Sequence, residues 1–248
     1  MKLKPNHPAL SEARSIHTGH TPARPVSDAV TLLRPVNSNA KVGKGKGTIQ
    51  RGKWKGFRLF SLTLEERKTC PPDCLRWAEC FGNAMPFAAR WEHGPNLEAR
   101  LRQEVAALSA LYPSGFAVRL HILGDFYSQG YVELWGELLQ AFPSLHVYGY
   151  TARHDGIIAK ALDRLRLLFP DRWRVRVSRN FPADSLRIYA SQEGTVKGEV
   201  VCPEQTGKVE SCLDCGLCWD IDRTIAFRDH DKLARERKEK RNEAHTSS

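Results

Sequence analysis

The chain has 248 residues, of which 41% are hydrophobic, and it carries a formal net charge of +10. This is enough apolar material for a sizeable core, and the length allows one large domain or two small ones. The first forty residues hold no apolar run typical of a signal peptide or a membrane span, and seven cysteines cannot all pair in disulfides. A secreted, disulfide-stapled protein is therefore disfavoured, and we expect a cytoplasmic protein with no membrane partner.

Residues 1–40 are predicted to be a largely disordered segment, because they contain five prolines and no periodic apolar pattern. The next stretch, residues 41–58, has alternating glycines, no acidic residue and seven basic ones. This composition is typical either of a flexible basic loop that lies on phosphates or of a solvated linker. The basic residues are Lys41, Lys44, Lys46, Arg51, Lys53, Lys55 and Arg58.

Residues 41–201 show an alternation of strands and helices. Apolar runs with strand character begin after Phe57 and at Ala117, Leu145, Trp173 and Arg187, the middle three 28 residues apart. Helical spacing of apolar residues marks 95–111, 131–142 and 156–169. Strand–helix–strand units of this length form parallel sheets. The predicted fold is α/β, a partial or full (βα) barrel, followed by a cysteine-rich metal-binding segment at 202–230 and a charged tail at 231–248.

One face of the predicted sheet is polar, because side chains alternate between the two faces of a strand. It carries Arg119, His121, His146, Tyr148, Tyr150, Arg174, Arg176, Ser178, Arg187 and Tyr189. Such a face indicates a water-accessible lumen or concave surface in which arginines bind an anionic substrate. The alternative is that these arginines pair with carboxylates of a second domain. The predicted substrate-binding residues are Arg119, His121, Tyr150, Arg153, Arg174 and Arg176.

The cysteines form two groups, three between residues 70 and 80 and four between residues 202 and 218. Clustered cysteines in a reducing compartment usually bind metal. Three thiolates leave a coordination position open, whereas four satisfy either zinc or an iron–sulfur cluster. The predicted metal ligands are Cys70, Cys74, Cys80, Cys202, Cys212, Cys215 and Cys218.

A three-cysteine loop after the first strand, with a glycine–acidic pair closing the second, resembles the radical S-adenosylmethionine (SAM) enzymes. The resemblance implies that Cys70, Cys74 and Cys80 hold a [4Fe-4S] cluster open to SAM, although their spacing is Cys-x3-Cys-x5-Cys and not the usual Cys-x3-Cys-x2-Cys. It also implies cofactor contacts from Gly124, Asp125, Ser178 and Asn180. The four-cysteine group would then hold a second iron–sulfur cluster or zinc.

The chain also resembles the phage and plasmid family called gene product eighty-eight, over roughly residues 39–230. The residues that carry this resemblance are the Lys-Gly stretch, TCPPDC with the third cysteine, LGDF, YTAR, CPEQ, SCLDCGLCW and IAFRDH. The activity of that family is not established, so this resemblance implies relatives and no reaction.

Together these features predict an iron–sulfur protein that binds a [4Fe-4S] cluster and SAM and acts by radical chemistry on an anionic substrate, such as a nucleotide or nucleic acid. An electron donor would be a further partner. The alternative is a zinc-stabilised nucleic-acid-binding protein without catalysis, in which His93 is the nearest fourth ligand for the first cysteine group. No catalytic residue is predicted.

Overall fold

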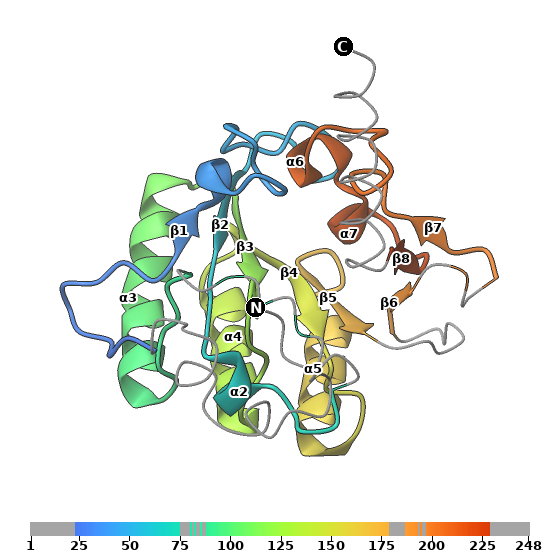
Figure 1. The fold of residues 1–248 in the computed structure, drawn as a ribbon. Coiled ribbons are helices and arrows are strands. Elements are labelled where there is room, and N and C mark those ends of the chain that lie inside the picture. Colours follow the sequence, from blue (N-terminus) through green and yellow to red (C-terminus); the bar gives the residue numbers. More distant parts are fainter. Residues whose placement is uncertain are drawn as a thin grey trace, which may run out of the picture.

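The computed structural model describes residues 23–74, 80, 82, 85, 88–178, 187–192, 194 and 197–228. Its centre is a sheet of eight strands in the order β1-β2-β3-β4-β5-β6-β8-β7 (Figure 1). Every neighbouring pair is parallel except β1 with β2. The strands are β1 (Arg34–Pro35), β2 (Arg58–Ser61), β3 (Phe116–Leu120), β4 (Leu145–Thr151), β5 (Trp173–Ser178), β6 (Tyr189–Gln192), β7 (Val200–Val201) and β8 (Ile225–Phe227).

The sheet is open, so the expectation of a full barrel is corrected. Closure would need the first and last strands of the order to pair with each other. Instead β1 pairs with β2, and β7 pairs with β8. The two edge strands have only two residues each, and β1 runs antiparallel to its neighbour. The predicted α/β class is confirmed, and so are the parallel strands, with β1 as the exception.

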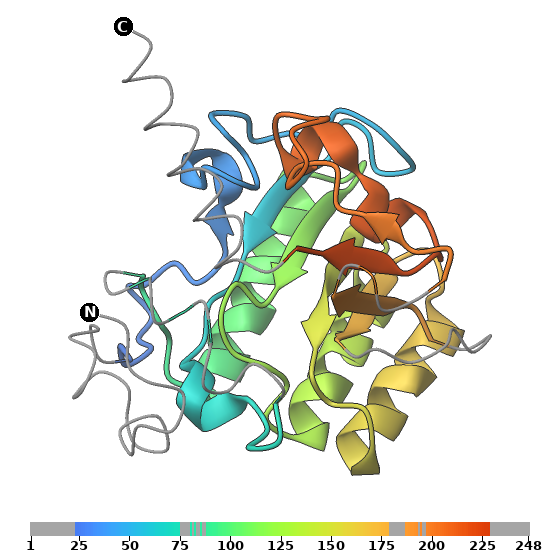
Figure 2. The same cartoon turned by 45° about the vertical axis from the view of Figure 1, so that its right-hand side comes forward.

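Three long helices cover one face of the sheet and lie side by side (Figures 1 and 2). The predicted helices and strands of residues 95–178 are confirmed: α3 spans Pro95–Leu111, the predicted bounds, and β5 (Trp173–Ser178) begins at the predicted residue. The hydroxyl of Ser128 accepts a hydrogen bond from the N–H of Tyr131 and so caps α4. The remaining helices are α4 (Gln129–Ala141), α5 (Gly156–Leu168), the short α2 (Glu66–Thr69), α6 (Cys212–Cys215) and α7 (Leu217–Asp220), and the 3₁₀ turn η2 (Val36–Ser38).

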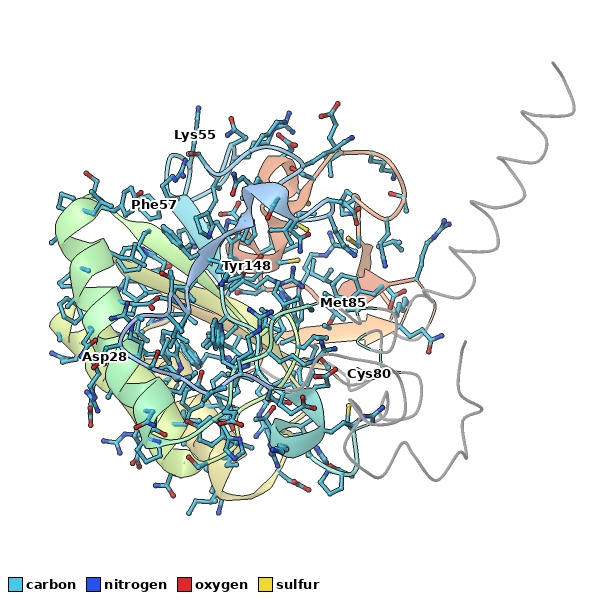
Figure 3. All side chains as sticks on the ribbon, turned by 60° about the vertical axis from the view of Figure 1, so that its left-hand side comes forward. Asp28, Lys55, Phe57, Cys80, Met85 and Tyr148 are labelled. Atoms are coloured by element: carbon cyan, nitrogen blue, oxygen red, sulfur yellow. The ribbon has the colours of Figure 1, made fainter. Side chains whose placement is uncertain are left out.

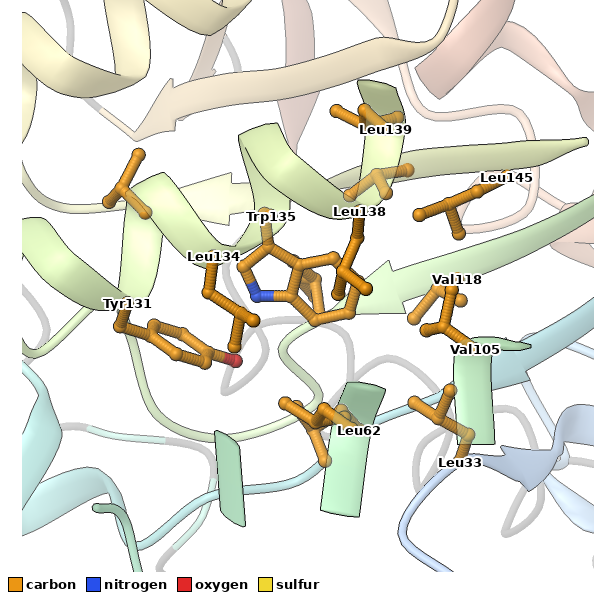
Figure 4. Packing of buried hydrophobic residues seen from close by; sticks show 14 of the residues in the cluster. Leu33, Leu62, Val105, Val118, Tyr131, Leu134, Trp135, Leu138, Leu139 and Leu145 are labelled. Carbon is orange, nitrogen blue, oxygen red and sulfur yellow. The ribbon is translucent and has the colours of Figure 1, made fainter. Parts of the chain in front are cut away.

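The main hydrophobic core fills the space between these helices and the sheet (Figure 4). Trp135 of α4 and Trp173 of β5 are fully buried in it. Val118 and Val147, on neighbouring strands, face this core, as strand alternation predicts. None of the helices in the described ranges is both long and apolar enough to cross a membrane.

The segment before β2 belongs to the packed structure. Residues 1–22 lie outside the described part of the chain, but Leu32 and Leu33 are buried in the main core. The carboxylate of Glu104 on α3 accepts hydrogen bonds from both of their N–H groups, at 2.7 and 2.8 Å. The strand that follows, β1, has only two residues. The carboxylate of Glu104 therefore replaces the main-chain hydrogen bonds that a longer strand would make.

The opposite face of the sheet is covered by two segments that are distant in sequence. We call residues 41–57 the strap and residues 202–228 the four-cysteine segment. Trp54 of the strap stacks on Trp219 at 5.9 Å between ring centroids, in a second core with Leu213. Lys41 pairs with Glu204, and further ion pairs join the two segments.

This packing corrects the expectation of a flexible loop or a solvated linker. Val42, Ile49 and Trp54 anchor the strap in the second core. The N–H groups of Cys212 and Leu213 donate to carbonyls of the strap, and the strap residue Gln50 donates back to the carbonyl of Leu213. The predicted tail at 231–248 lies outside the described residues.

Candidate metal centres

The four cysteines of the four-cysteine segment line one cavity of about 50 Å³. The cavity lies on the face of the sheet opposite the three long helices, which we call the concave face. Helix α6 contributes Cys212 and Cys215, and α7 contributes Cys218. Between them stands Gly216, whose φ of +77° is a left-handed conformation that glycine adopts without strain. This turn brings all three cysteines to the wall of the cavity, opposite Cys202.

Two arginines of β5 hold this segment on the sheet. Arg176 donates to the carbonyls of Cys218 and Arg223, each at 2.9 Å. Arg174 donates to the carbonyl of Ile221 and pairs with the carboxylate of Asp222. The prediction that these arginines face a water-filled lumen is therefore corrected, because their hydrogen bonds are made within the protein. The alternative prediction, that these arginines pair with carboxylates of a second domain, is closer to the observed contacts. Most of the acceptors, however, are main-chain carbonyls and not carboxylates.

Arg119, Tyr148 and Tyr150 face the cavity from β3 and β4. The hydroxyl of Tyr150 donates to the sulfur of Cys218 over 2.9 Å. Burial lowers the pKa of Arg119, but the neighbouring Tyr148, Cys212, Tyr150 and Cys218 outweigh it and leave that pKa above its ordinary value. The wall of the cavity is therefore cationic where it meets the thiols.

Burial holds three thiols of this cavity, those of Cys202, Cys212 and Cys215, in their neutral form in the absence of a cation. Burial, followed by the charge of Cys218, raises the pKa of Cys212 to about 12. Burial also raises the pKa of Cys215 to about 11 and that of Cys202 above its ordinary value. A bound metal would reverse these shifts, since metal ligation deprotonates a thiol. The donor set fits a cysteine-bound centre.

The first cysteine group lies elsewhere, at the carboxyl ends of β2, β3 and β4. Cys70 follows α2 directly, and Figure 3 shows Cys80 beside that helix. Burial, followed by the charges of Asp125, Cys74 and Cys80, raises the pKa of Cys70 far above its ordinary value. Burial lowers the pKa of Arg67, and the charges of all three cysteines act in the opposite direction and raise it. The group predicted from the sequence is therefore brought together with Asp125.

Arg153 joins this group to β4. Its guanidinium donates to the carbonyls of Thr69 and Phe126, both at 2.9 Å, and its charge favours the thiolate of Cys70. His154, the next residue, lies 4.0 Å from the carboxylate of Asp73 in the cysteine loop. The convergence of the loops that follow β2, β3 and β4 at one edge is confirmed, as expected for parallel strands.

Gly124 and Asp125 occupy a tight turn after β3. At Gly124, with a φ of +91°, a Cβ atom would come within 2.8 Å of both Leu64 and Thr69, so only glycine fits. The carboxylate of Asp125 accepts hydrogen bonds from the Thr151 hydroxyl and from two N–H groups, each at 2.7 Å. Burial raises its pKa to about 6 despite these bonds. The cofactor role implied for this pair is not tested by these contacts.

The other predicted residues are dispersed. His121 lies on the helix side of the sheet, with its Nε2 3.0 Å from the Tyr131 hydroxyl. Its predicted place on the concave face is corrected, because β3 ends at Leu120 and strand alternation stops there. Ser178 ends β5, half-buried, while Asn180 lies outside the described residues. His93 packs against Tyr127, with the ring centroids 4.9 Å apart.

Sequence reasoning missed the ion pair of Glu66 and Arg90, which is almost fully buried next to the first cysteine group. Arg90 also donates to the carbonyls of Gly82, Met85 and Ala88. Neither residue belongs to a motif, so the sequence offers no signal for the pair. Lys41 was noted as basic, but its place beside the four cysteines depends on the fold.

Within the described residues, no three His, Cys, Asp or Glu side chains are grouped closely enough to hold a single metal ion.

A comparison with family models finds a match to "Gene product 88" over residues 31–221, which include all seven cysteines. The chain belongs to the gene product 88 family.

Two curated relatives are both called "Gene 88 protein", one from Mycobacterium phage L5 and one from Mycobacterium phage D29. They are 28% and 27% identical to this chain over alignments of 128 and 129 residues, and each alignment covers 44% of the chain. The chain spans about half the length of these relatives (53% of each). No solved structure matches. These matches do not support the resemblance to radical SAM enzymes, which stays a prediction.

Proposed function

We propose that this protein is an iron–sulfur enzyme with an open centre at Cys70, Cys74 and Cys80 and a closed centre at the four-cysteine cavity. The open centre would bind SAM and act on an anionic substrate. One observation carries the proposal: three cysteines gather at the carboxyl edge of a parallel sheet, beside the buried Asp125. This edge is where α/β sheets place their reactive groups.

The charges around the three cysteines support an anionic centre. Arg67 and Arg153 both interact with the thiols of this group. Two guanidinium groups balance thiolates that would otherwise repel each other, and they offer donors to a carboxylate. The bound cofactors would supply one-electron chemistry, whereas the protein would hold and orient them and exclude water.

A single zinc ion and a four-iron cluster need different separations between their cysteine ligands. Tetrahedral zinc with Zn–S bonds of about 2.3 Å brings its sulfurs to within about 4 Å of each other. A four-iron cluster carries one cysteine on each iron and therefore spreads its ligands further apart. Four cysteines line one cavity of this protein, and they supply enough thiolates for either centre.

The test is iron and sulfide analysis with an absorption spectrum on anaerobically purified full-length protein. We expect a brown protein with broad absorbance near ~400 nm. C70A should lose about four irons and four sulfides, and C215A should lose the other centre only. Reduced wild-type protein given SAM should release 5′-deoxyadenosine, and C70A should not. A wild-type protein that contains iron but releases no 5′-deoxyadenosine would contradict the radical SAM part of the proposal.

A second candidate is a zinc-stabilised nucleic-acid-binding protein, favoured by the outer surface of the strap. In the described structure no ion pair engages the side chains of Lys44, Arg51 or Lys55, and all three residues are exposed. Figure 3 shows Lys55 at the rim of the molecule. This candidate predicts a colourless, zinc-loaded protein whose binding to DNA or RNA weakens steeply with salt and with K44A/K55A.

A further inference from the structure

Arg119 differs from the other arginines of the concave face. It stands near the end of β3, and its side chain lines the cavity of the four cysteines. Its Nε is buried and has no hydrogen-bond partner within the described residues. The groups that act on its charge are the phenols of Tyr148 and Tyr150 and the thiols of Cys212 and Cys218.

By contrast, Arg176 is fully buried and donates to several carbonyls, and Arg174 pairs with Asp222. A guanidinium N–H group that is buried without an acceptor, such as the Nε–H of Arg119, destabilises the folded state, because it loses its hydration without replacement. The phenols and thiols around it accept no hydrogen bond from its Nε and so do not replace that hydration. An anionic group in the cavity would.

We propose that Arg119 is the counter-ion of a negatively charged metal centre bound by Cys202, Cys212, Cys215 and Cys218. This inference rests on the closed centre of the proposed function. Four thiolates around a doubly charged zinc ion or cluster core leave a net charge of about −2. Lys41 also lines the cavity, but its ammonium pairs with Glu204 at 3.3 Å. Arg119 therefore provides the positive charge that no carboxylate offsets among the described residues.

A counter-ion at this place stabilises the more negative, reduced state of a cluster more than the oxidised state. Removing the charge should therefore lower the reduction potential of the centre. A purely structural arginine would not have this effect, because loss of packing changes stability without selecting one redox state. The reduction potential thus separates the two roles.

The test compares R119M and R119K in a C70A background, so that only the four-cysteine centre titrates. We expect R119M to disfavour reduction at least tenfold, which corresponds to about 59 mV for one electron. R119K should restore most of the potential, since it keeps the charge. The control R174M removes an arginine of the same face that does not line the cavity. It should lower the melting temperature and leave the potential unchanged.

An unchanged potential in R119M, or a shift that R119K does not restore, overturns the inference. If R119M does not fold, R119Q keeps a polar end without the charge and takes its place.

Metal analysis of the wild-type protein separates this inference from the proposed function. If the four-cysteine centre holds zinc, the iron–sulfur proposal fails for that centre, and release of zinc to a chelator decides the inference. R119M should then release zinc at least tenfold faster than R119K, and equal rates overturn the inference. A four-cysteine segment that binds no metal also overturns it, whereas the 5′-deoxyadenosine assay still tests the open centre.

Discussion

The hydroxyl of Tyr150 donates a hydrogen bond to the sulfur of Cys218 over 2.9 Å. The next residue, Thr151, donates to the carboxylate of Asp125, which in turn acts on Cys70. Consecutive residues at the end of β4 therefore reach the two cysteine groups of the protein. The two cysteine groups are thus linked to each other through the end of β4.

The first prediction concerns the hydrogen bond from Tyr150. Burial, followed by the charge of Cys218, raises the pKa of Tyr150 well above its ordinary value, so the phenol stays protonated and donates. Hydrogen bonds to ligand sulfurs raise the potential of iron–sulfur centres. We expect Y150F to lower the potential of the four-cysteine centre by tens of millivolts. The matched control is Y148F, because the buried hydroxyl of Tyr148 has no hydrogen-bond partner in the described structure. Equal potentials in Y150F and Y148F would rule the effect out.

The second prediction concerns Asp125, whose pKa burial raises to about 6 from an ordinary value of 3.8. Because the folded-state pKa is the higher one, protonation favours the folded state. That contribution is complete below pH 3.8 and is lost as the pH rises through 6. Relative to D125N, the wild-type protein should gain about 2 kcal/mol of unfolding free energy between pH 7 and pH 4. Urea unfolding at each pH measures the difference, and a constant difference would contradict the assignment.

The third prediction concerns His121, whose effect on stability has the opposite pH dependence. Burial lowers the pKa of His121 to about 3, against an ordinary value of 6.5. The neutral ring is thus the folded form, and its contribution is complete above pH 6.5 and is lost as the pH falls toward 3. H121Q keeps a group able to bond to the Tyr131 hydroxyl but does not titrate. At pH 4 the wild-type protein should have lost about 3 kcal/mol relative to H121Q, compared with their difference at pH 7. Parallel stability curves for the two proteins would show that His121 is not the group responsible.

The fourth prediction concerns the segment before β2. E104A would leave the buried N–H groups of Leu32 and Leu33 without an acceptor, at a cost of about 2–3 kcal/mol. Hydrogen exchange at both amides should become faster. The control is E137A, which removes an exposed ion pair with Arg102 and should cost less than about 1 kcal/mol. Similar losses in the two variants would mean that Glu104 does not anchor the segment.

The elements of residues 95–178 could be predicted from sequence, because their periodicity is local. Trp173–Ser178 alternates, and Pro95–Leu111 has its apolar residues on one face, so each pattern indicates its own structure. Strand β8 could not be found in this way. Ile225–Phe227 has three residues, and its place between β6 and β7 depends on contacts that are distant in sequence.

The cysteine groups could be predicted from spacing, but the role of the surrounding arginines could not. Alternation correctly put Arg174 and Arg176 on one face of the sheet. Their acceptors are largely main-chain carbonyls of residues 217–223, and a carbonyl leaves no trace in a sequence. The strap was misjudged for a similar reason, since its glycines and lysines suggested a linker while Trp54 and Ile49 anchor it.

Among the described residues, strand β7 pairs with β8 alone, and Val201 is synthesised 24 residues before Ile225. During synthesis, β7 therefore leaves the ribosome with no strand to pair with, while the sheet up to β6 is already available. The same holds for the strap, because the Trp219 ring that covers Trp54 is synthesised much later than Trp54. The concave face thus closes in one late event, and a nascent chain stalled before residue 219 would present its aromatic side chains to chaperones.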